Sequence, residues 1–332
     1  QTDIVGCLPT ETGIMGSLTT NLHMLMASFY KPTGERKKIL IEPHAFPSDR
    51  YAASAQVAWH GGNPNTDIVT LEAENPDHLT PDDLERTLHH HRDICLALLG
   101  GVNYYTGQFL DIASMSPILK SQEITFGLDL AHAVGNVPLE LHDWGIDFAS
   151  WCTYKYLNAG PGSIAGYFVN HKHHADKTLI RLAGWWGNDP DTRFDMHGQE
   201  HFIPRQSADG WKTSNPSLLA MIPLKESLEM FADHGMVALR ERSIRLTEYF
   251  EKGVKAIKNI SSITPTDPKR RGCQISVRVS GSASDLEEKL IGCGVVPDAR
   301  DPDILRFAPV PMYTTFSDIA RAVQELDRLV TN

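Results

Sequence analysis

Two apolar runs near the middle of the chain show the clearest pattern of buried strands. They extend from Ile124 to Asp129 and from Ile146 to Cys152, and apolar residues occupy both alternating faces of each run. That pattern is typical of strands inside a parallel sheet. Asp129 ends the first run, and Lys155 closely follows the second. Because ligands of an open α/β sheet bind beyond the carboxyl ends of its strands, we predict that both side chains meet at one site.

Shorter apolar and amphipathic segments alternate through the first two-thirds of the chain. Further strands are predicted at 38–42, 67–71, 94–99 and 163–169. Helices are predicted to begin near Thr19, Ser48 and Thr80, which are residue types that cap helices, and another covers 113–122. Strands that alternate with helices favour an α/β fold, with a mostly parallel sheet, right-handed crossovers and flanking helices.

The last third of the chain has a different pattern. Two long amphipathic helices are predicted at 217–233 and 236–257. They lead into a strand at 272–280, a helix at 285–291, strands at 295–296 and 305–308, and a final helix at 316–329. We therefore predict a large domain over 1–215, linking helices over 216–257 and a small α+β C-terminal domain over 258–332.

Composition and charge narrow the class of protein. The chain has 332 residues, of which 41% are hydrophobic, and its formal charge is −10. An acidic chain without a basic cluster is poorly suited to bind nucleic acid or an anionic membrane. No apolar run reaches the length of a membrane span. The five cysteines show no CxxC pairing, so we interpret them as reduced thiols of a cytoplasmic protein.

Two groups of histidines invite a metal-binding interpretation. One is His89–His91 at the end of a predicted helix, and the other comprises His171, His173 and His174. Consecutive residues of a helix point in different directions, so neighbours in sequence do not converge on one ion. We interpret both groups as solvated turns and predict no metal site.

Lys155 and Asp129 together indicate a cofactor. Pyridoxal 5′-phosphate (PLP) needs a lysine that bonds covalently to its aldehyde and an acid that pairs with its pyridinium nitrogen. Taken singly, the acid could cap a helix and the lysine could lie on the surface. The lysine, however, stands between Tyr154 and Tyr156 and is followed by a glycine-rich turn. This setting is unusual for a surface lysine and favours the cofactor.

Three other features have a functional and a structural interpretation. The hydroxyls at Thr19 and Thr20 can help bind a phosphate at a helix N-terminus or simply cap the helix. Phe46, at a strand end, can stack on a flat cofactor or belong to the core. Arg306 lies inside an apolar strand, where its planar fork can bind a substrate carboxylate or form a structural ion pair.

Long segments of the chain resemble the kynureninase family, a branch of the fold-type I PLP enzymes. They are GLDLAHAVGN at 127–136, LHDWGIDFASWCTYKYLNAGPG at 141–162, GWWG at 184–187 and RFAPVPMY at 306–313. The resemblance extends over essentially the whole chain. Kynureninases usually carry a region before the part that aligns, so we expect that this chain lacks it. The family often has Ser where this chain has Gly100.

The resemblance implies a set of cofactor-binding residues. Leu18 and Thr19 would contact the phosphate, and Phe46 would stack on the pyridine ring beside Pro47, Ser48 and Asp49. His132 would orient Asp129 or the ring hydroxyl, and Trp185 and Asn215 would reach the phosphate across a homodimer interface.

It also implies catalytic and substrate-binding residues. Lys155 and Asp129 would be catalytic, and Tyr154 would either activate water or bind the phosphate. Arg306 would bind the α-carboxylate of the amino-acid substrate, with Trp186 and Asn215 near the rest of that substrate.

The implied reaction is the hydrolysis of the Cβ–Cγ bond of L-kynurenine or 3-hydroxy-L-kynurenine, a step of tryptophan catabolism and NAD biosynthesis. The products are anthranilate, or its 3-hydroxy form, and L-alanine. The alternatives are another fold-type I enzyme, such as a cysteine desulfurase or an aminotransferase, and an inactive PLP-fold subunit. A desulfurase needs a catalytic cysteine on a mobile loop, and Cys293 is the nearest candidate.

Overall fold

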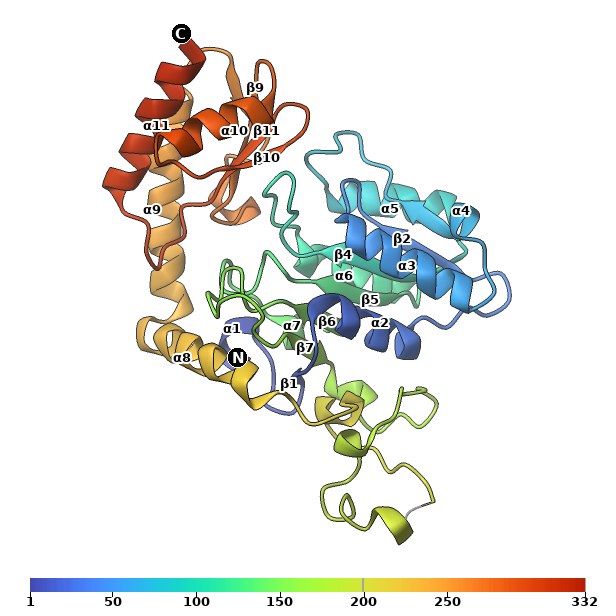
Figure 1. Ribbon diagram of the computed structural model, residues 1–332. Coiled ribbons are helices and arrows are strands. Elements are labelled where there is room, and N and C mark those ends of the chain that lie inside the picture. Colours follow the sequence, from blue (N-terminus) through green and yellow to red (C-terminus); the bar gives the residue numbers. More distant parts are fainter. Residues whose placement is uncertain (199, 332) are drawn as a thin grey trace.

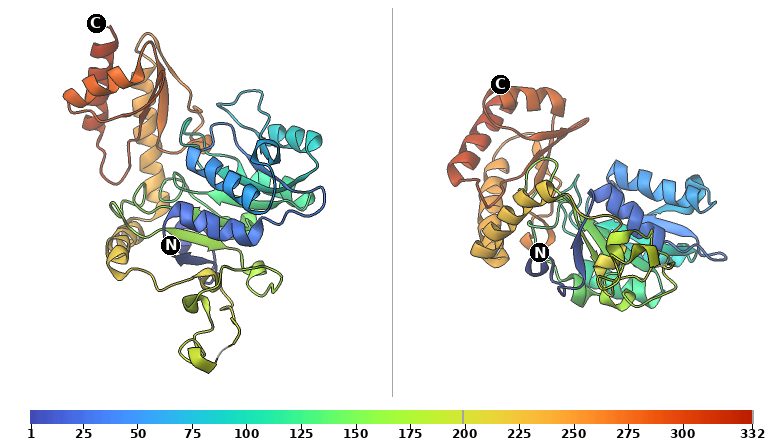
Figure 2. Two further views of the ribbon diagram at one scale, coloured as in Figure 1. Left: turned by 45° about the vertical axis from the view of Figure 1, so that its right-hand side comes forward. Right: turned by 60° about the horizontal axis from the view of Figure 1, so that its bottom comes forward.

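The computed structural model describes residues 1–198 and 200–331, which form a large and a small body. The large body is built on a seven-stranded sheet and the small body on a four-stranded sheet. Helix α9 (Met236–Val254) runs from one body to the other (Figure 1). Residues 184–198 and 200–213 extend away from the large body, as Figure 1 and the left view of Figure 2 show.

The large sheet is mostly parallel, which confirms the predicted fold class. Its order is β1-β7-β6-β5-β4-β2-β3, and the five strands from β6 to β3 pair in parallel. β7 pairs antiparallel with β6, and β1 pairs antiparallel with β7. The strands are β1 (Thr12–Ile14), β2 (Lys38–Ile41), β3 (Ile68–Thr70), β4 (Ile94–Gly100), β5 (Thr125–Asp129), β6 (Phe148–Trp151) and β7 (Gly166–Val169).

Helices cover both faces of this sheet, because alternate strand residues point to opposite sides. On one face, α2 (Leu18–Phe29) and α3 (Pro47–Trp59) pack against a core that includes Ile39 and Ile41. On the other face, α5 (Pro81–His90), α6 (Ile112–Ser121) and α8 (Leu218–His234) pack against a core that includes Leu40. The predicted helix starts near Thr19, Ser48 and Thr80 therefore lie close to observed ones. The remaining α-helices of the large body are short: α1 (Thr2–Val5), α4 (Pro64–Asp67) and α7 (Leu141–Trp144).

The small body is an antiparallel sheet of order β10-β11-β9-β8, covered by helices. Its strands are β8 (Ile260–Ser262), β9 (Ile275–Val279), β10 (Asp298–Arg300) and β11 (Ile304–Phe307). Its helices are α10 (Ala283–Gly292) and α11 (Phe316–Thr331), which share one apolar core with the second half of α9. The domain boundaries at residues 215 and 257 stay predictions.

The strand predicted at 295–296 is wrong. The chain forms no strand there, and β10 begins at Asp298 instead. Val295 is buried whereas Val296 is 80% exposed, so the two valines are not both core residues. Pro297, which follows, has no N–H to donate to a ladder, so pairing starts one residue later.

The interpretation of His171, His173 and His174 as a solvated turn is wrong for the last two, whereas the side chain of His171 is 55% exposed. The Nδ1 atom of His171 lies 3.0 Å from Oε1 of Glu11, and Nε2 of His173 lies 2.8 Å from Oδ1 of Asp147. His174 is buried and bonds the carbonyl of Val169. All three rings bind groups that are distant in sequence or buried, which the local sequence did not indicate.

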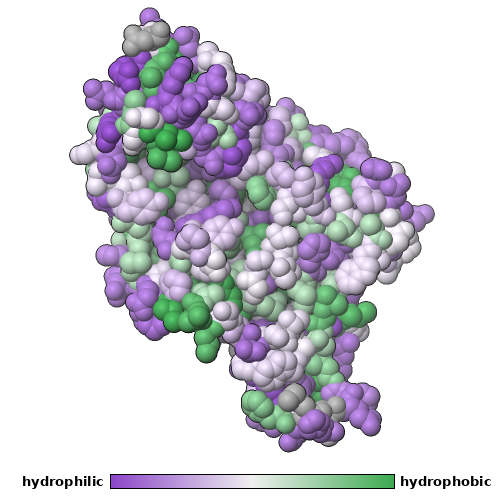
Figure 3. Space-filling model, in the orientation of Figure 1, coloured by the Kyte–Doolittle hydropathy of each residue, from purple (hydrophilic) through white to green (hydrophobic). Residues whose placement is uncertain are grey.

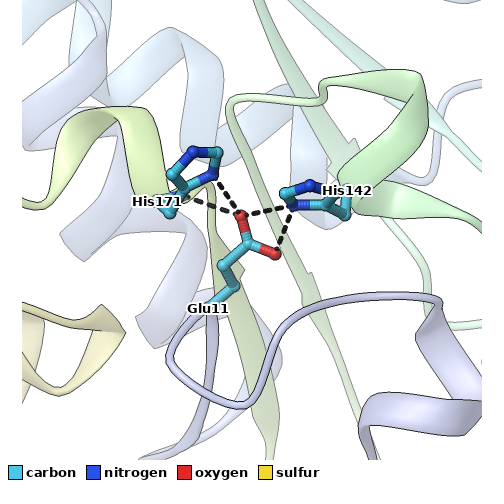
Figure 4. A group of neighbouring side chains, drawn as sticks. All are labelled: Glu11, His142 and His171. Carbon is cyan, nitrogen blue, oxygen red and sulfur yellow. Dashed lines mark hydrogen bonds and ion pairs between the residues drawn. The ribbon is translucent and has the colours of Figure 1, made fainter.

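Glu11, His142 and His171 form a polar cluster, which we name the Glu11 cluster (Figure 4). The Glu11 side chain is fully buried. Its carboxylate accepts hydrogen bonds from the Nδ1 atoms of both histidines, at 3.0 Å. It also accepts from the backbone N–H groups of Leu8 (2.9 Å) and His171 (2.8 Å). The cluster therefore ties the N-terminal segment to α7 and to the segment after β7.

No helix among the described residues has the length and apolar character that a membrane crossing requires.

Candidate active site

A cavity of about 260 Å³ lies at the carboxyl ends of β2, β4, β5 and β6, and we name it the strand-end cavity. Glu42, Gly100, Asp129 and Cys152 each end or directly follow one of these strands and line it. Its other lining residues are Ser17, Leu18, Thr19, Phe46, Asp49, Val102, Tyr104, Ala131, His132, Tyr154 and Lys155. Lys155 and Asp129 thus face one cavity, as the two apolar runs predicted.

The amine of Lys155 has one close polar partner. Its Nζ atom lies 3.1 Å from Nε2 of His132. Burial lowers the pKa of His132 well below its usual value, and the nearby Lys155 lowers it further. The Nδ1 atom of the same ring is buried and without a hydrogen-bond partner. A neutral imidazole therefore stands beside the lysine, with an unused polar atom.

Three acids share the floor of the cavity. Asp129 accepts a hydrogen bond from the N–H of Ala131 at 2.6 Å. Burial raises the pKa of Asp49 well above its usual value, and the charge of Asp129 raises it further. Burial also raises the pKa of Glu42, to about 7. Three carboxyls this close cannot all ionise cheaply in a buried site, so the floor retains protons at neutral pH.

Aromatic rings form one wall of the cavity. Phe46 is 40% exposed although it is a large apolar residue, because it faces the cavity rather than the core. Its ring meets the ring of Tyr104 edge to face, with centroids 5.2 Å apart. The Lys155 amine is 5.7 Å from the centroid of Phe46. The wall therefore offers a flat apolar surface next to the amine, as stacking on a planar ligand requires.

The N-terminus of α2 opens onto the same cavity. Ser17, Leu18 and Thr19 line it, and the Ser17 side chain makes no capping hydrogen bond. The Thr19 hydroxyl lies 3.0 Å from the hydroxyl of Ser48 in the first turn of α3, which Pro47 begins. Uncapped N–H groups at a helix N-terminus attract anions.

Gly100 has no side chain, and the carboxyl group of Glu42 occupies the space where a Cβ atom would lie. A Cβ atom added to Gly100 would lie 2.8 Å from Oε1 of Glu42. The Glu42 carboxyl accepts hydrogen bonds from the N–H of Gly100 (3.0 Å) and from Nδ2 of Asn103 (2.9 Å). A serine at this position would therefore require the Glu42 side chain to shift.

Arg306 lies on β11 beside the cavity rather than in its lining. All three nitrogens of its guanidinium have partners. Nε and Nη2 contact the two carboxylate oxygens of Asp298 at 3.1 and 2.8 Å. Its Nη1 donates to the carbonyl of Tyr104 at 2.6 Å. The structural ion pair considered for Arg306 is thus present, and the arginine is held next to a residue that lines the cavity.

Three expected site residues lie apart from the strand-end cavity. Trp185 and Trp186 belong to the 184–213 extension, where their rings meet edge to face at 5.0 Å. Asn215 lines a separate cavity of about 480 Å³ next to Gly16 and Thr20. Within the described part of one chain, these residues do not join Lys155.

Sequence reasoning missed two lining residues that matter. Glu42 directly follows a buried strand, which is the same signal that identified Asp129. Tyr104 carried no such signal, because its place depends on the turn that follows β4. The cysteine proposed for a desulfurase is not in the cavity: Cys293 lies in the small body, with Sγ 3.2 Å from Arg328.

Solved structures of other proteins define the class of fold. A cysteine desulfurase from Thermococcus onnurineus matches 99% of this chain and 82% of its own, with a TM-score of 0.82 and 14% sequence identity. A C-DES mutant with glycine linked covalently to its PLP cofactor matches 98% of this chain and 83% of its own. Its TM-score is 0.83 at 15% identity. The chain therefore has the fold-type I architecture of PLP-dependent enzymes.

Sequence relatives then identify the family. Residues 239–326 match the kynureninase C-terminal domain. A kynureninase from Salinispora tropica is 49% identical, covering 97% of this chain and 76% of the relative. One from Xanthomonas axonopodis pv. citri is 46% identical, covering 98% of this chain and 78% of the relative. The chain belongs to the kynureninase family, which confirms the resemblance seen in its motifs.

Proposed function

We propose that this chain is a PLP-dependent hydrolase that cleaves the Cβ–Cγ bond of L-kynurenine or 3-hydroxy-L-kynurenine. One water is consumed, the aryl carbonyl leaves as anthranilate or its 3-hydroxy form, and the other three carbons leave as L-alanine. Membership of the kynureninase family supports the reaction. The observation that carries the proposal is that Lys155 and Asp129 line one cavity.

The lining of the cavity fits PLP. Two buried atoms there lack partners, Nδ1 of His132 and Oδ1 of Asp49, and a bound polar ligand would satisfy them. The α2 N-terminus with Thr19 would hold the phosphate, and Phe46 would cover the ring. When bound, PLP supplies an electron-withdrawing ring conjugated to the substrate Cα.

Lys155 has two duties in this proposal: it bonds the cofactor and it moves a proton at the substrate Cα. A lysine must give up its own proton before it acts as a base. Nε2 of the neutral His132 is 3.1 Å away and can accept a hydrogen bond from the amine, which orients Nζ. Tyr154 lines the same cavity and is 51% exposed, so water reaches its hydroxyl. We assign Tyr154 to orient the attacking water or the phosphate.

The acids have complementary duties. Asp129 would pair with the ring nitrogen and keep it protonated. Asp49, whose pKa is raised by burial and by the charge of Asp129, is the acid of the cavity floor that would hold a proton beside it.

Arg306 would bind the α-carboxylate of the substrate. Asp298 and the Tyr104 carbonyl hold its guanidinium, so little side-chain freedom remains to be lost on binding. Its side chain is 10% exposed, so the substrate carboxylate would join Asp298 in contacting a poorly solvated positive charge.

We further propose a homodimer with shared active sites. Leu218, Leu219 and Ile222 on α8 are 75%, 81% and 56% exposed. Figure 3 shows a hydrophobic patch where α8 lies in Figure 1. Apolar surface of this kind is typical of an interface. Asn215, just before α8, and Trp185 would then reach the cavity of the partner, with Trp186 near the aromatic part of the substrate.

The cysteines support the proposal of a cytoplasmic enzyme. All five are free. Burial raises the pKa values of Cys7, Cys95 and Cys273 to about 12, so these thiols stay protonated. Free, unreactive thiols suit a reducing compartment.

Lys155→Ala tests the function directly. We expect loss of the visible absorbance of lysine-bound PLP and at least a thousandfold loss of anthranilate release, followed by its fluorescence, roughly the size expected when a nucleophile and base are removed. Lys258→Ala is the control, because that lysine is exposed in the turn between α9 and β8, outside the cavity lining and the proposed interface on α8. Normal turnover by Lys155→Ala, or absence of turnover by the unaltered holoenzyme, would contradict the proposal.

A further inference from the structure

The turn at residues 103–106, which we name the 103–106 turn, lies between the strand-end cavity and the small body. Its first residue is Asn103, which is buried, and Tyr104 lines the cavity. The carbonyls of the next three residues, 104, 105 and 106, all accept hydrogen bonds from side chains of the small body. Figure 1 shows the loop after β4 reaching toward β9 and β11.

The side chain of Asn103 shapes this turn from the inside. Its Oδ1 accepts the N–H groups of Tyr105 and Thr106 at 2.9 and 3.0 Å. Its Nδ2 donates to Oε1 of Glu42 at 2.9 Å. Glu42 is itself held by the N–H of Gly100 at the end of β4. One amide therefore fixes both the curvature of the turn and its distance from the floor of the cavity.

The outer side of the turn holds the arginine. The Tyr104 carbonyl accepts Nη1 of Arg306 at 2.6 Å and Nε2 of Gln274 at 2.8 Å. The Tyr105 carbonyl accepts the hydroxyl of Ser276 at 2.6 Å. Ser276 and Arg306 are direct partners in the β9–β11 ladder. Two adjacent carbonyls thus bind two adjacent residues of one sheet.

We propose that Asn103 is a positioning residue that sets where Arg306 stands relative to the cofactor, acting through the Tyr104 carbonyl. Asn103 itself contacts neither Arg306 nor the expected substrate. The inference rests on the proposed function, in which Arg306 binds the α-carboxylate. In this proposal, the large body helps to recognise the amino-acid end of the substrate. The hydrogen bond between Asn103 and Glu42 connects that recognition to the floor of the cavity.

Asn103→Ala removes both sets of hydrogen bonds, so the turn loses its internal support. A displacement of about 1 Å in a positioning group can cost about a hundredfold in rate. Here the displaced group is a binding group, so we expect KM for kynurenine to rise about ten- to a hundredfold while kcat falls less than about threefold.

Two ligands separate positioning from general damage. L-Alanine carries the α-amino acid group, and an aryl ketone such as 2-aminoacetophenone carries the aromatic end alone. Inhibition by each is measured with the PLP-loaded enzyme. We expect the inhibition constant of L-alanine to rise in Asn103→Ala in step with KM, and that of the ketone to stay within about twofold. A merely structural role would weaken both or reduce kcat.

Gln108→Ala is the matched control. Gln108 is a buried amide of the same loop, but its side chain binds the backbone of Leu79 at 2.8 and 2.6 Å instead of supporting the turn. Gln108→Ala should lower the stability of the protein without a selective rise in the inhibition constant of L-alanine. If Asn103→Ala does not fold, Ser276→Ala tests the same link from the small body and should give the same selective change.

These experiments distinguish failure of the positioning role of Asn103 from failure of the proposed hydrolase function. If the unaltered holoenzyme does not hydrolyse kynurenine, the function fails whatever the variants do. If it does, and both Asn103→Ala and Ser276→Ala leave KM and L-alanine inhibition unchanged, the positioning role is overturned. Equal losses for L-alanine and the ketone would overturn it as well.

Discussion

Two carboxylates of the large body, Asp49 and Glu11, are almost equally buried and behave in opposite ways. Asp49 is 7% exposed and its Oδ1 atom has no partner. Glu11 is 0% exposed and receives N–H groups from four directions. Burial and Asp129 raise the pKa of Asp49, whereas hydrogen bonds at Glu11 outweigh its burial and lower its pKa.

The difference indicates how the candidate site differs from a structural cluster of buried polar groups. Burial by itself is common to both acids, so it does not discriminate. In the Glu11 cluster, both carboxylate oxygens accept hydrogen bonds from neighbouring N–H groups, as is typical of a structural element. The strand-end cavity keeps unmatched polar atoms and protons, which a ligand can use. We therefore expect changes in the cavity to affect chemistry more than folding, and changes in the Glu11 cluster to do the reverse.

The largest effect is expected for Asp129→Asn. Asparagine keeps the acceptor for the Ala131 N–H but cannot hold the charge that pairs with a protonated ring nitrogen. Turnover should fall about 100- to 1000-fold, the range seen when one electrostatic partner of the reacting system is removed. The melting temperature of the cofactor-free protein should change little. A large fall in melting temperature with turnover preserved would erase the contrast with the Glu11 cluster.

A second effect is expected in the pH dependence of stability. The pKa of Glu42 is raised to about 7 in the folded protein, above its ordinary value of 4.5. Between these values the folded state binds more protons than the unfolded state, so the free energy of unfolding should decrease as pH rises from about 4.5 to 7. Converted at about 1.4 kcal/mol per pKa unit, the decrease is about 3 kcal/mol.

Glu42→Gln should remove this decrease in the cofactor-free protein. Urea denaturation between pH 4.5 and 8 measures it, with the unaltered protein as the reference. Parallel profiles of the two proteins would show that Glu42 titrates normally and that the floor of the cavity does not retain this proton.

The smallest of the three effects concerns Glu11→Gln. Replacing the carboxylate weakens its hydrogen bonds to two histidines and two backbone N–H groups, and should lower the free energy of unfolding by about 2 kcal/mol. Activity per folded molecule should stay within about twofold. Because its pKa in the folded protein is lowered, Glu11 stabilises the protein above its ordinary pKa of 4.5. That contribution is lost as pH falls through the folded value, so the variant should show a shallower acid limb.

The same variant tests another use of the cluster. Its three ligand atoms lie within 4.8 Å of one another, a spacing that a divalent ion can share. A rise in melting temperature with added Zn²⁺ that the variant abolishes would identify a metal site. A response that is the same in both proteins would leave the hydrogen-bonded cluster as described.

Local patterns predicted the centre of the site but not its surroundings. Asp129 and Lys155 were found because each stands next to a strand whose burial is evident from its own residues. The long helices were found for the same reason. Glu42 also directly follows a buried strand, although a shorter one, and it was not identified from the sequence. The sequence pattern itself was sufficient to predict its position.

Other features depend on contacts that no local pattern reveals. Glu11 binds His142 and His171, which are 131 and 160 residues away. Nothing near His171 in sequence indicates a buried acid. β10 was misplaced because its pairing with β11, rather than its composition, makes it a strand. For Arg306, the sequence left an ion pair and a substrate site as alternatives, and the partner Asp298 became evident with the fold.

Helix α9 limits where residues can be inserted into or deleted from the chain. Leu239 near its start belongs to the core of the large body, and Leu246, Phe250 and Val254 belong to the core of the small body. Adding one residue between Leu239 and Leu246 would turn everything that follows by about 100° and advance it by about 1.5 Å. Arg306 would then leave the neighbourhood of Tyr104. Insertions and deletions in active descendants of this chain should therefore accumulate in surface loops. They should be absent from α9 between Leu239 and Leu246.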